Sequence, residues 1–305
     1  MGRMRTGLAF GALLVVVVAG WTAAFTRTSP TPTPLPITSG SSATDDTATT
    51  TTANATRFSD FNRDGFTDLV ARDTTGRLWL YPGNGTGGFL ARHLMATGWN
   101  GMTAIVTTGD VTGDGNADIV ARAGNGVLWL YPGDGAGGLS ARRVIGSGWQ
   151  TMNAITDAGD MNGDGRPDLL ARDQAGTLWL FAFSGDAVLQ NGTKISKGWN
   201  GLTFIGPGDV SGDGRADILA CDSAGRLWLY PGDGTGGVGA RILVSEVSAP
   251  VTALATPGNL DLAKGNDLIS RDAARRLWLY LGNNNGGFSA PRQIPGEWKD
   301  LSYIG

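Results

Sequence analysis

The sequence Arg-Asp-Thr-Thr-Gly-Arg-Leu-Trp-Leu-Tyr-Pro-Gly at residues 72–83 sets the architecture, because it returns four times with small changes. The copies lie at 122–133, 172–183, 221–232 and 271–282. A period of about fifty residues means that the chain is built from copies of one supersecondary unit. We therefore divide residues 57–305 into five repeat units.

Each unit contains four short strand candidates separated by turn residues. In the second unit they are 102–107, 119–122, 127–131 and 141–145, which are rich in β-branched and aromatic residues and are bounded by Gly, Asp and Asn clusters. A repeated four-stranded module is typical of a β-propeller, whose small sheets pack around a central axis. The sequence predicts an all-β propeller of about five four-stranded blades, and a linear solenoid is the alternative.

The two ends of the repeat region are complementary. Residues 298–304 match 99–105, the strand that precedes an acidic loop in the second unit, whereas the first unit has only polar residues at the aligned positions 53–56. A C-terminal strand that completes the first sheet would close the ring and leave no open sheet edge. This complementarity favours a closed propeller over a solenoid.

An acidic loop of the form Asp-x-(Asn/Ser/Thr)-x-Asp-Gly-x-x-Asp follows the first strand of a unit. Calcium takes about six to eight hard oxygen ligands from carboxylates, amides, hydroxyls and carbonyls. Alternating side chains of the loop offer such oxygens, and its glycine permits a sharp turn. We predict four Ca²⁺ sites with the ligands Asp60, Asn62, Asp64, Asp68, Asp110, Thr112, Asp114, Asp118, Asp160, Asn162, Asp164, Asp168, Asp209, Ser211, Asp213 and Asp217.

The fifth loop, residues 259–267, departs from this pattern. Ala263 replaces the third ligand and Lys264 replaces the turn glycine, which brings a positive charge to the site. We therefore expect weak calcium binding or none in this loop. For any single loop, an Asp-Gly turn whose aspartates accept hydrogen bonds from their own backbone is the alternative. Four copies in register favour calcium.

These loops, followed by Asp-Leu/Ile-Leu/Val-Ala-Arg, and the fifty-residue period resemble the FG-GAP and VCBS repeats, calcium-loop propeller repeats that are also found in the integrin α head. The resemblance covers about residues 57–305. The Phe-Gly and Gly-Ala-Pro elements that name the family are matched only in part, by Gly-Gly-Phe at 87–89 and Gly-Pro at 206–207. In that family the loop joins the first two strands of a blade and stabilises it, while partners bind elsewhere on the propeller. The resemblance therefore implies structural calcium.

The first 56 residues differ in composition from the repeats. Arg3 and Arg5 precede an apolar run that extends to Phe25, so 1–26 is predicted to be an apolar helix serving as a signal peptide or an uncleaved signal anchor. The Thr-, Ser- and Pro-rich segment 27–56 is predicted to be a disordered linker. Either form of the leader places the repeats outside the cell, secreted or on the cell surface.

Charge and cysteine content narrow the function further. The net charge of -3 argues against nucleic-acid binding, which needs a basic face, and leaves the possible N-terminal anchor as the only membrane contact. Cys221 is the only cysteine, so no intramolecular disulfide forms and calcium is the expected stabiliser of an exported domain. We expect a monomer.

Two series of tryptophans recur in the units. The first stands mid-strand between leucines and is expected in the core between blades. The second lies in Gly-Trp turns, where the residues either stack on sugar rings or pack over the blade edge. The first series is Trp79, Trp129, Trp179, Trp228 and Trp278, and the second is Trp99, Trp149, Trp199 and Trp298.

The sequence favours a non-enzymatic binding or adhesion module for extracellular polysaccharide, cell wall or a protein ligand. The alternative is a propeller-fold hydrolase or lyase of extracellular polysaccharide, and a passive spacer is a third possibility. His93 is the only histidine and most acidic residues belong to the loops, so we expect no catalytic residues. Strand-end aspartates are interpreted as turn formers: Asp73, Asp173, Asp222 and Asp272.

Overall fold

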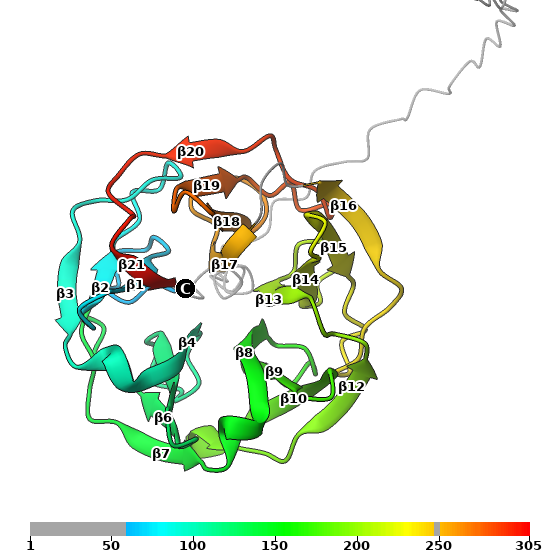
Figure 1. Ribbon diagram of the computed structural model, residues 1–305, viewed down its shortest axis with the longest axis horizontal. Coiled ribbons are helices and arrows are strands. Elements are labelled where there is room, and N and C mark those ends of the chain that lie inside the picture. The colour runs from blue at the N-terminus through cyan, green and yellow to red at the C-terminus, as the bar shows by residue number, and fades with distance from the viewer. Residues whose placement is uncertain (1–58, 247–250) are drawn as a thin grey trace, which may run out of the picture. The chain divides into compact units, whose positions relative to one another are not determined.

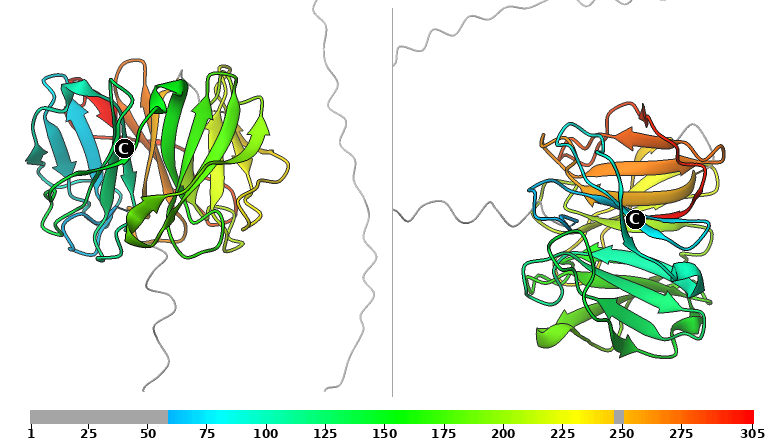
Figure 2. Two further views of the ribbon diagram at one scale, coloured as in Figure 1. Left: turned by 90° about the horizontal axis from the view of Figure 1, so that it is seen from below. Right: turned by 90° about the vertical axis from the view of Figure 1, so that its left-hand side faces the viewer.

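The computed structural model describes residues 59–246 and 251–305. Within these residues, five antiparallel sheets stand around a central axis (Figure 1). Figure 2 shows the same ring from the side. The predicted all-β propeller of five four-stranded blades is confirmed, while the predicted N-terminal helix and linker lie outside the described residues. No helix among the described residues is long and apolar enough to cross a membrane.

Each blade runs from an inner strand at the axis to an outer strand at the rim. In blade 3 a short additional strand, β11 (Val188–Leu189), also pairs with β10. In order from the axis, blade 1 consists of β21 (Leu301–Ile304), β1 (Leu69–Asp73), β2 (Leu78–Tyr81) and β3 (His93–Ala96), and blade 2 of β4 (Met102–Thr108), β5 (Asp118–Ala123), β6 (Leu128–Tyr131) and β7 (Arg143–Gly146). Blade 3 consists of β8 (Met152–Gly159), β9 (Asp168–Asp173), β10 (Thr177–Ser184) and β12 (Thr193–Lys197), and blade 4 of β13 (Thr203–Gly208), β14 (Asp217–Cys221), β15 (Arg226–Tyr230) and β16 (Ile242–Glu246). Blade 5 consists of β17 (Val251–Gly258), β18 (Asp267–Asp272), β19 (Leu277–Tyr280) and β20 (Arg292–Ile294).

The C-terminal strand closes the ring. β21 lies antiparallel to β1, with Ala71 opposite Ile304 and Arg72 opposite Tyr303 (Figure 1). Beyond the strand, Val70 and Gly305 exchange two backbone hydrogen bonds of 2.9 Å. The last strand in the sequence thus completes blade 1, as the complementary ends of the repeats predicted.

Apolar cores lie between neighbouring blades. One core joins Val70 and Leu80 of blade 1 to Ile119 and Tyr131 of blade 2, and equivalent clusters fill the other junctions. Each sheet is covered on both faces by its neighbours, so its central strands carry nearly continuous apolar sequence. The blades therefore depend on one another, because none can bury its two faces alone.

The turn tryptophans seal these junctions. Trp99 packs against Tyr131 with 4.5 Å between ring centroids, and its backbone N–H donates to the Gly76 carbonyl of the preceding blade. The four members of the series are at most 7% exposed. Packing is therefore the correct interpretation of this series, and their buried faces do not serve as open stacking platforms. The equivalent ring pairs are Trp149 with Phe181, Trp199 with Tyr230, and Trp298 with Tyr81.

The mid-strand tryptophans pack against the cores but are only partly buried. The Trp79 indole N–H donates to Asp73 Oδ2 at 2.9 Å, and the Arg92 guanidinium lies 4.2 Å above its ring. Asp73 Oδ1 also accepts from the backbone N–H groups of Thr75 and Arg77. The interpretation of Asp73 as a turn former is confirmed, and the structure adds that the same carboxylate fixes the tryptophan.

An arginine at the end of the second strand joins most blades to the next. Arg72 Nη1 of blade 1 donates to the carbonyls of Trp99 (3.0 Å) and Met102 (2.7 Å), which lead into blade 2. In blade 4 Cys221 stands at this position and is buried in the strand. The junction between blades 4 and 5 thus lacks both this arginine and a turn tryptophan. The other arginines of the series are Arg122, Arg172 and Arg271.

Candidate metal and ligand sites

The acidic loops connect the first and second strands in blades 2 to 5, and in blade 1 the loop leads directly into the second strand, β1. In blade 2 the loop leaves β4 after Thr108 and enters β5 at Asp118. Gly115 has a φ of 84°, a left-handed conformation that glycine adopts without strain. The strand–loop–strand arrangement predicted for these residues is confirmed.

The first aspartate of a loop accepts hydrogen bonds from the loop backbone. Asp110 Oδ1 accepts from the N–H groups of Gly113 (2.6 Å) and Asp114 (3.1 Å), and Oδ2 accepts from Gly115 (2.7 Å). Asp160 and Asp209 make the corresponding bonds in their own loops. These contacts fix the tight turn. They are the hydrogen bonds expected of an Asp-Gly turn whose aspartates accept from their own backbone, which was the alternative to a calcium-binding loop.

The ninth position of each loop has a role that sequence reasoning missed. Asp118 is fully buried, and its carboxylate accepts from Val111 N–H in the loop and from Gly133 N–H after the third strand, both at 3.0 Å. It therefore ties the loop to the far side of its blade. Burial raises the pKa of Asp118 to about 6 despite these donors. Asp68, Asp217 and Asp267 make the same pair of contacts.

The loops have the donor chemistry of a calcium site. In the first loop Asp60 Oδ1 is buried and has no hydrogen-bond partner in the part of the chain that the structure describes, so a ligand oxygen is left for an ion. Burial raises the pKa of Asp68 to about 7, and the neighbouring charges of Asp64 and Asp60 add to this rise. Among the described residues, no three acidic, histidine or cysteine side chains converge on one point. Any ion would thus also use amide, hydroxyl and backbone oxygens.

The fifth loop is held together differently. The Asn259 side-chain amide donates to the Ala263 carbonyl, so the loop is closed by an amide where the other loops have an aspartate. Asp261 accepts from the backbone N–H of Ala263 at 2.9 Å. The loop keeps its turn and its buried Asp267 without the third carboxylate. Its degenerate donor set agrees with the sequence analysis.

A wide depression lies between the loops of blades 1 to 4. Its volume is about 930 Å³, and its lining combines the first aspartates of the loops with arginines. Arg63 reaches across to the neighbouring loop, where it donates to the Asp114 carbonyl at 3.2 Å. The charged lining residues are Asp60, Asp110, Asp160, Asp209, Arg63, Arg166 and Arg215.

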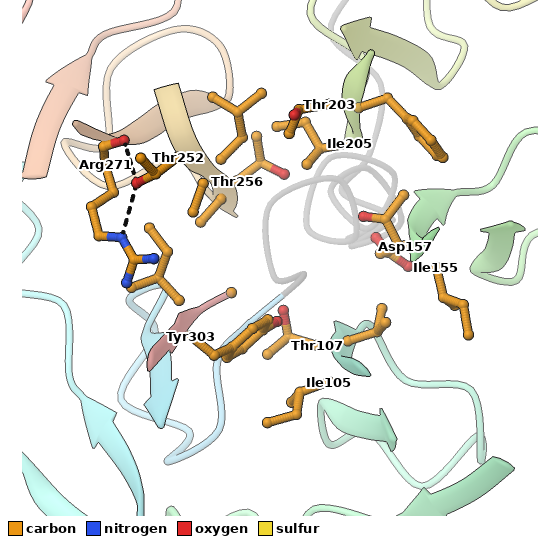
Figure 3. A pocket seen from close by; sticks show the side chains of 18 of the residues that line it. Ile105, Thr107, Ile155, Asp157, Thr203, Ile205, Thr252, Thr256, Arg271 and Tyr303 are labelled. Carbon is orange, nitrogen blue, oxygen red and sulfur yellow. Dashed lines mark hydrogen bonds between the residues drawn. The ribbon is translucent and has the colours of Figure 1, made fainter. Parts of the chain in front are cut away.

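A narrower cavity of about 290 Å³ follows the axis of the ring. Its wall consists largely of the inner strands, which place Ile105, Ile155 and Ile205 around it. Figure 3 shows the Asp157 side chain of β8 extending into this channel across from Tyr303. Asp157 is not part of an acidic loop and was not singled out in the sequence.

A third recess of about 460 Å³ lies at the junction of blades 5 and 1. Tyr81, Phe89 and Trp298 form its aromatic wall, with 6.3 Å between the Tyr81 and Phe89 ring centroids. Arg92 and Glu297 are exposed at its rim. Here β20 ends four residues before Trp298, whereas β3 ends three residues before Trp99, so the connecting segment is longer at this junction.

Neither His93 nor Cys221 belongs to these recesses. His93 is half-buried, and its Nε2 lies 3.3 Å from the Gly137 carbonyl in the neighbouring blade. Burial raises the pKa of the Cys221 thiol, and the neighbouring Asp222 charge adds to the rise. Both residues are thus held in structural positions.

The profile of the FG-GAP-like repeat matches residues 60–121, 119–171 and 160–220. Together these matches span 60–220, more than half of the 305 residues. The chain belongs to the FG-GAP repeat family. Its FG-GAP loops are thus the acidic loops described above, and the likeness to VCBS repeats stays a resemblance.

Several solved structures are similar to this FG-GAP propeller, but at TM-scores below 0.5 the similarity carries no functional argument. The Agrocybe aegerita lectin that recognises non-reducing terminal N-acetylglucosamine has 16% identity, a TM-score of 0.46 and coverage of 79% of this chain and 66% of its own. The BP39L lectin of Burkholderia pseudomallei has 16% identity, a TM-score of 0.47 and coverage of 76% and 70%. The Photorhabdus luminescens Tc holotoxin pore has 19% identity, a TM-score of 0.45 and coverage of 81% and 12%. The sequence has no match among curated proteins.

Proposed function

We propose that this FG-GAP propeller is an exported, calcium-stabilised, non-enzymatic binding module that recognises extracellular or cell-wall polysaccharide at the junction of blades 5 and 1. The observation that carries the proposal is the recess in which the Phe89 ring is partly exposed beside Arg92 and Glu297. A sugar ring has apolar C–H faces and a rim of hydroxyl groups. It therefore suits a pocket that combines an aromatic wall with a few polar groups.

The local chain path supports this choice of site. At the three junctions among blades 1 to 4 a short turn places tryptophan directly over the core, whereas Pro295, Gly296 and Glu297 make the approach to Trp298 longer. Trp298 is itself buried, with its indole N–H donating to the Ile294 carbonyl at 3.0 Å. The added residues thus leave Phe89 and the Glu297 carboxylate as the accessible binding groups.

Calcium is the second part of the proposal. Four loops carry complete sets of oxygen donors, and the buried, unpartnered Asp60 Oδ1 fits a metal ligand. Bound calcium would supply positive charge among carboxylates that otherwise repel one another. The loop carboxylates would hold the ion, and the buried ninth aspartate would transmit that restraint to the far strands of its blade. Calcium thus serves stability in this proposal, and the ligand binds elsewhere.

The alternative of a polysaccharide hydrolase or lyase is less well supported. Hydrolysis of a glycosidic bond commonly uses two carboxyl groups about 5 to 9.5 Å apart. Among the described residues that line the axial channel, Asp157 is the only one with a carboxylate side chain. A single carboxyl group surrounded by isoleucine and threonine favours binding over this chemistry.

A glycan array tests the carbohydrate proposal. We expect the calcium-loaded protein to retain a defined polysaccharide, and Phe89→Ala to weaken its binding about tenfold, which corresponds to about 1.4 kcal/mol. Glu297→Gln is expected to weaken binding without changing the melting temperature.

Phe288→Ala is the matched control, since Phe288 holds the position of Phe89 in blade 5, as the equivalent bridges Gly282–Phe288 and Gly83–Phe89 show. Equal losses in the two phenylalanine variants would contradict a site at the junction of blades 5 and 1. Retention of a protein in place of any glycan would assign the module to a protein ligand.

A further inference from the structure

The axial channel contains a carboxylate that neither the fold nor the proposed carbohydrate site uses. Asp157 Oδ1 is shielded from bulk solvent and has no hydrogen-bond partner among the described residues, and Oδ2 accepts a long bond of 3.3 Å from Gly159 N–H. An ionised carboxylate with so few donors is costly in a protein interior, because lost hydration is not replaced. Burial accordingly raises the pKa of Asp157 to about 8.

The strand register explains why this group faces the channel. Asp157 lies opposite Leu169 in blade 3, as Thr107 lies opposite Ile119 in blade 2. Figure 3 shows Thr107, Asp157 and Tyr303 on different sides of the same cavity. The repeat thus provides a polar position on the inner strand, and blade 3 alone places a carboxylate there.

No positive side chain among the described residues offsets this charge. Arg271 also lines the channel, but its Nε donates to Thr252 Oγ1 at 3.3 Å and its Nη1 to the Leu301 carbonyl at 3.0 Å. The negative charge of Asp168 further raises the free-energy cost of ionising Asp157. Among the described residues, Asp157 thus has no cationic partner.

We propose that the channel is a binding site for a small protonated primary amine with a short apolar stem, and that Asp157 is its counter-ion. The ammonium group is a charged donor for Asp157 Oδ1, and the hydroxyl groups of Thr107 and Thr256 also line the channel. Ile105 and Ile155 supply apolar wall for the stem. This site is separate from the carbohydrate recess and does not depend on it.

The size and lining of the channel favour an amine over a metal ion. Its 290 Å³ is several times the roughly 30 Å³ that one water molecule occupies in the liquid. A bare ion would leave most of this space unfilled, and calcium prefers several carboxylate and carbonyl oxygens close together. One carboxylate with isoleucine walls instead fits a charged head on an apolar stem.

Calorimetric titration of the full chain with n-butylammonium chloride tests the proposal, with 1-butanol as the neutral analogue and potassium chloride as the metal-ion arm. We expect one butylammonium per chain, no measurable binding of butanol, and at least a tenfold loss of amine affinity in Asp157→Asn. Glycan retention by Asp157→Asn is expected to match that of the unmodified protein.

Three results would overturn this assignment. Equal binding of butanol and butylammonium would show that charge recognition is absent, and this comparison needs no variant that could fail to fold. Saturable potassium binding that excludes butylammonium would make the channel a metal-ion site. Unchanged amine affinity in a folded Asp157→Asn protein would place the amine elsewhere.

Discussion

Aspartates in this protein behave according to the number of donors that reach each carboxylate. Five side-chain and backbone groups donate to Asp73 from Thr75, Arg77 and Trp79, so their bonds outweigh the cost of burial and hold its pKa well below the usual range. Asp118 has three donors and a raised pKa. Asp157 has one long bond and a higher pKa still. The hydrogen-bond donors that reach each aspartate thus decide whether its ionised form is stabilised.

Asp272→Ala tests this account at a strand-end aspartate. Burial opposes ionisation of Asp272, but bonds from Trp278 and Arg276 lower its pKa to about 2. The stability it contributes is therefore present above the ordinary aspartate pKa near 4 and is lost as pH falls through about 2. We expect Asp272→Ala to lower the free energy of unfolding by about 1 to 3 kcal/mol at pH 7.

Urea unfolding at pH 7 and at pH 2 measures this effect. The gap between the unmodified protein and the variant should narrow at the lower pH. Asp272→Asn is the conservative control and should show a smaller loss at pH 7. A gap that stays constant between the two pH values would mean that packing, and not the charge of Asp272, is responsible.

Sequence reasoning found the loop aspartates from their spacing but not their partners. Asp118 bonds Gly133, fifteen residues away, and this contact follows from the fold of the blade, not from a local pattern. The recurrence of a glycine after the third strand was the available signal. Asp157 carried no signal in the sequence, because only closure of the ring brings its strand to the axis.

At the scale of elements, the strands were predicted to within one or two residues. The predicted 102–107 corresponds to Met102–Thr108, and 141–145 to Arg143–Gly146. The outer strand begins later because the preceding turn forms its own Gly133–Leu139 bridge. In blade 3 the third strand extends to Ser184 and pairs with an added strand, since Ala182-Phe183-Ser184 replaces the Gly-Asp/Asn turn that follows the third strand in the other units.

The inter-blade arginines give a prediction at this scale. Arg172 Nη1 donates to the carbonyls of Trp199 and Leu202, both at 2.7 Å, so Arg172→Cys leaves two carbonyl groups without this charged donor. We expect a loss of about 1.5 to 3 kcal/mol in the free energy of unfolding. The substitution reproduces in blade 3 what blade 4 already has at Cys221.

Cys221→Arg is the reciprocal variant. The new guanidinium is expected to reach the Val251 carbonyl, which holds the place of Met102 in blade 2, and to raise the melting temperature. Guanidinium-chloride unfolding of both variants checks the pair. An unchanged midpoint in Arg172→Cys would show that the arginines do not contribute to the joining of blades.

At the scale of the whole molecule, the C-terminal strand β21 closes the ring, and neighbouring blades pack against each other at five junctions. β21 completes blade 1 by pairing with β1, and Gly87 N–H donates to the Leu260 carbonyl across the junction of blades 5 and 1 at 2.8 Å. The junction of blades 4 and 5 keeps the backbone bond from Gly286 to the Val210 carbonyl, but it lacks the arginine and tryptophan contacts of its neighbours. The contacts that join neighbouring blades are thus unevenly distributed around the ring. Calcium would stabilise blades 1 to 4, whose loops carry complete sets of oxygen donors.

Calcium titration of the metal-depleted protein, followed by calorimetry and by melting temperature, tests the central claim most directly. An ion that binds only the folded protein stabilises it by about 2.7 kcal/mol per site at a hundredfold excess over its Kd. We expect four ions per chain and a higher melting temperature. Asp114→Ala should bind three ions, and Asp261→Ala, which removes a carboxylate from the degenerate fifth loop, should still bind four. An unchanged melting temperature without any calcium uptake would contradict the account.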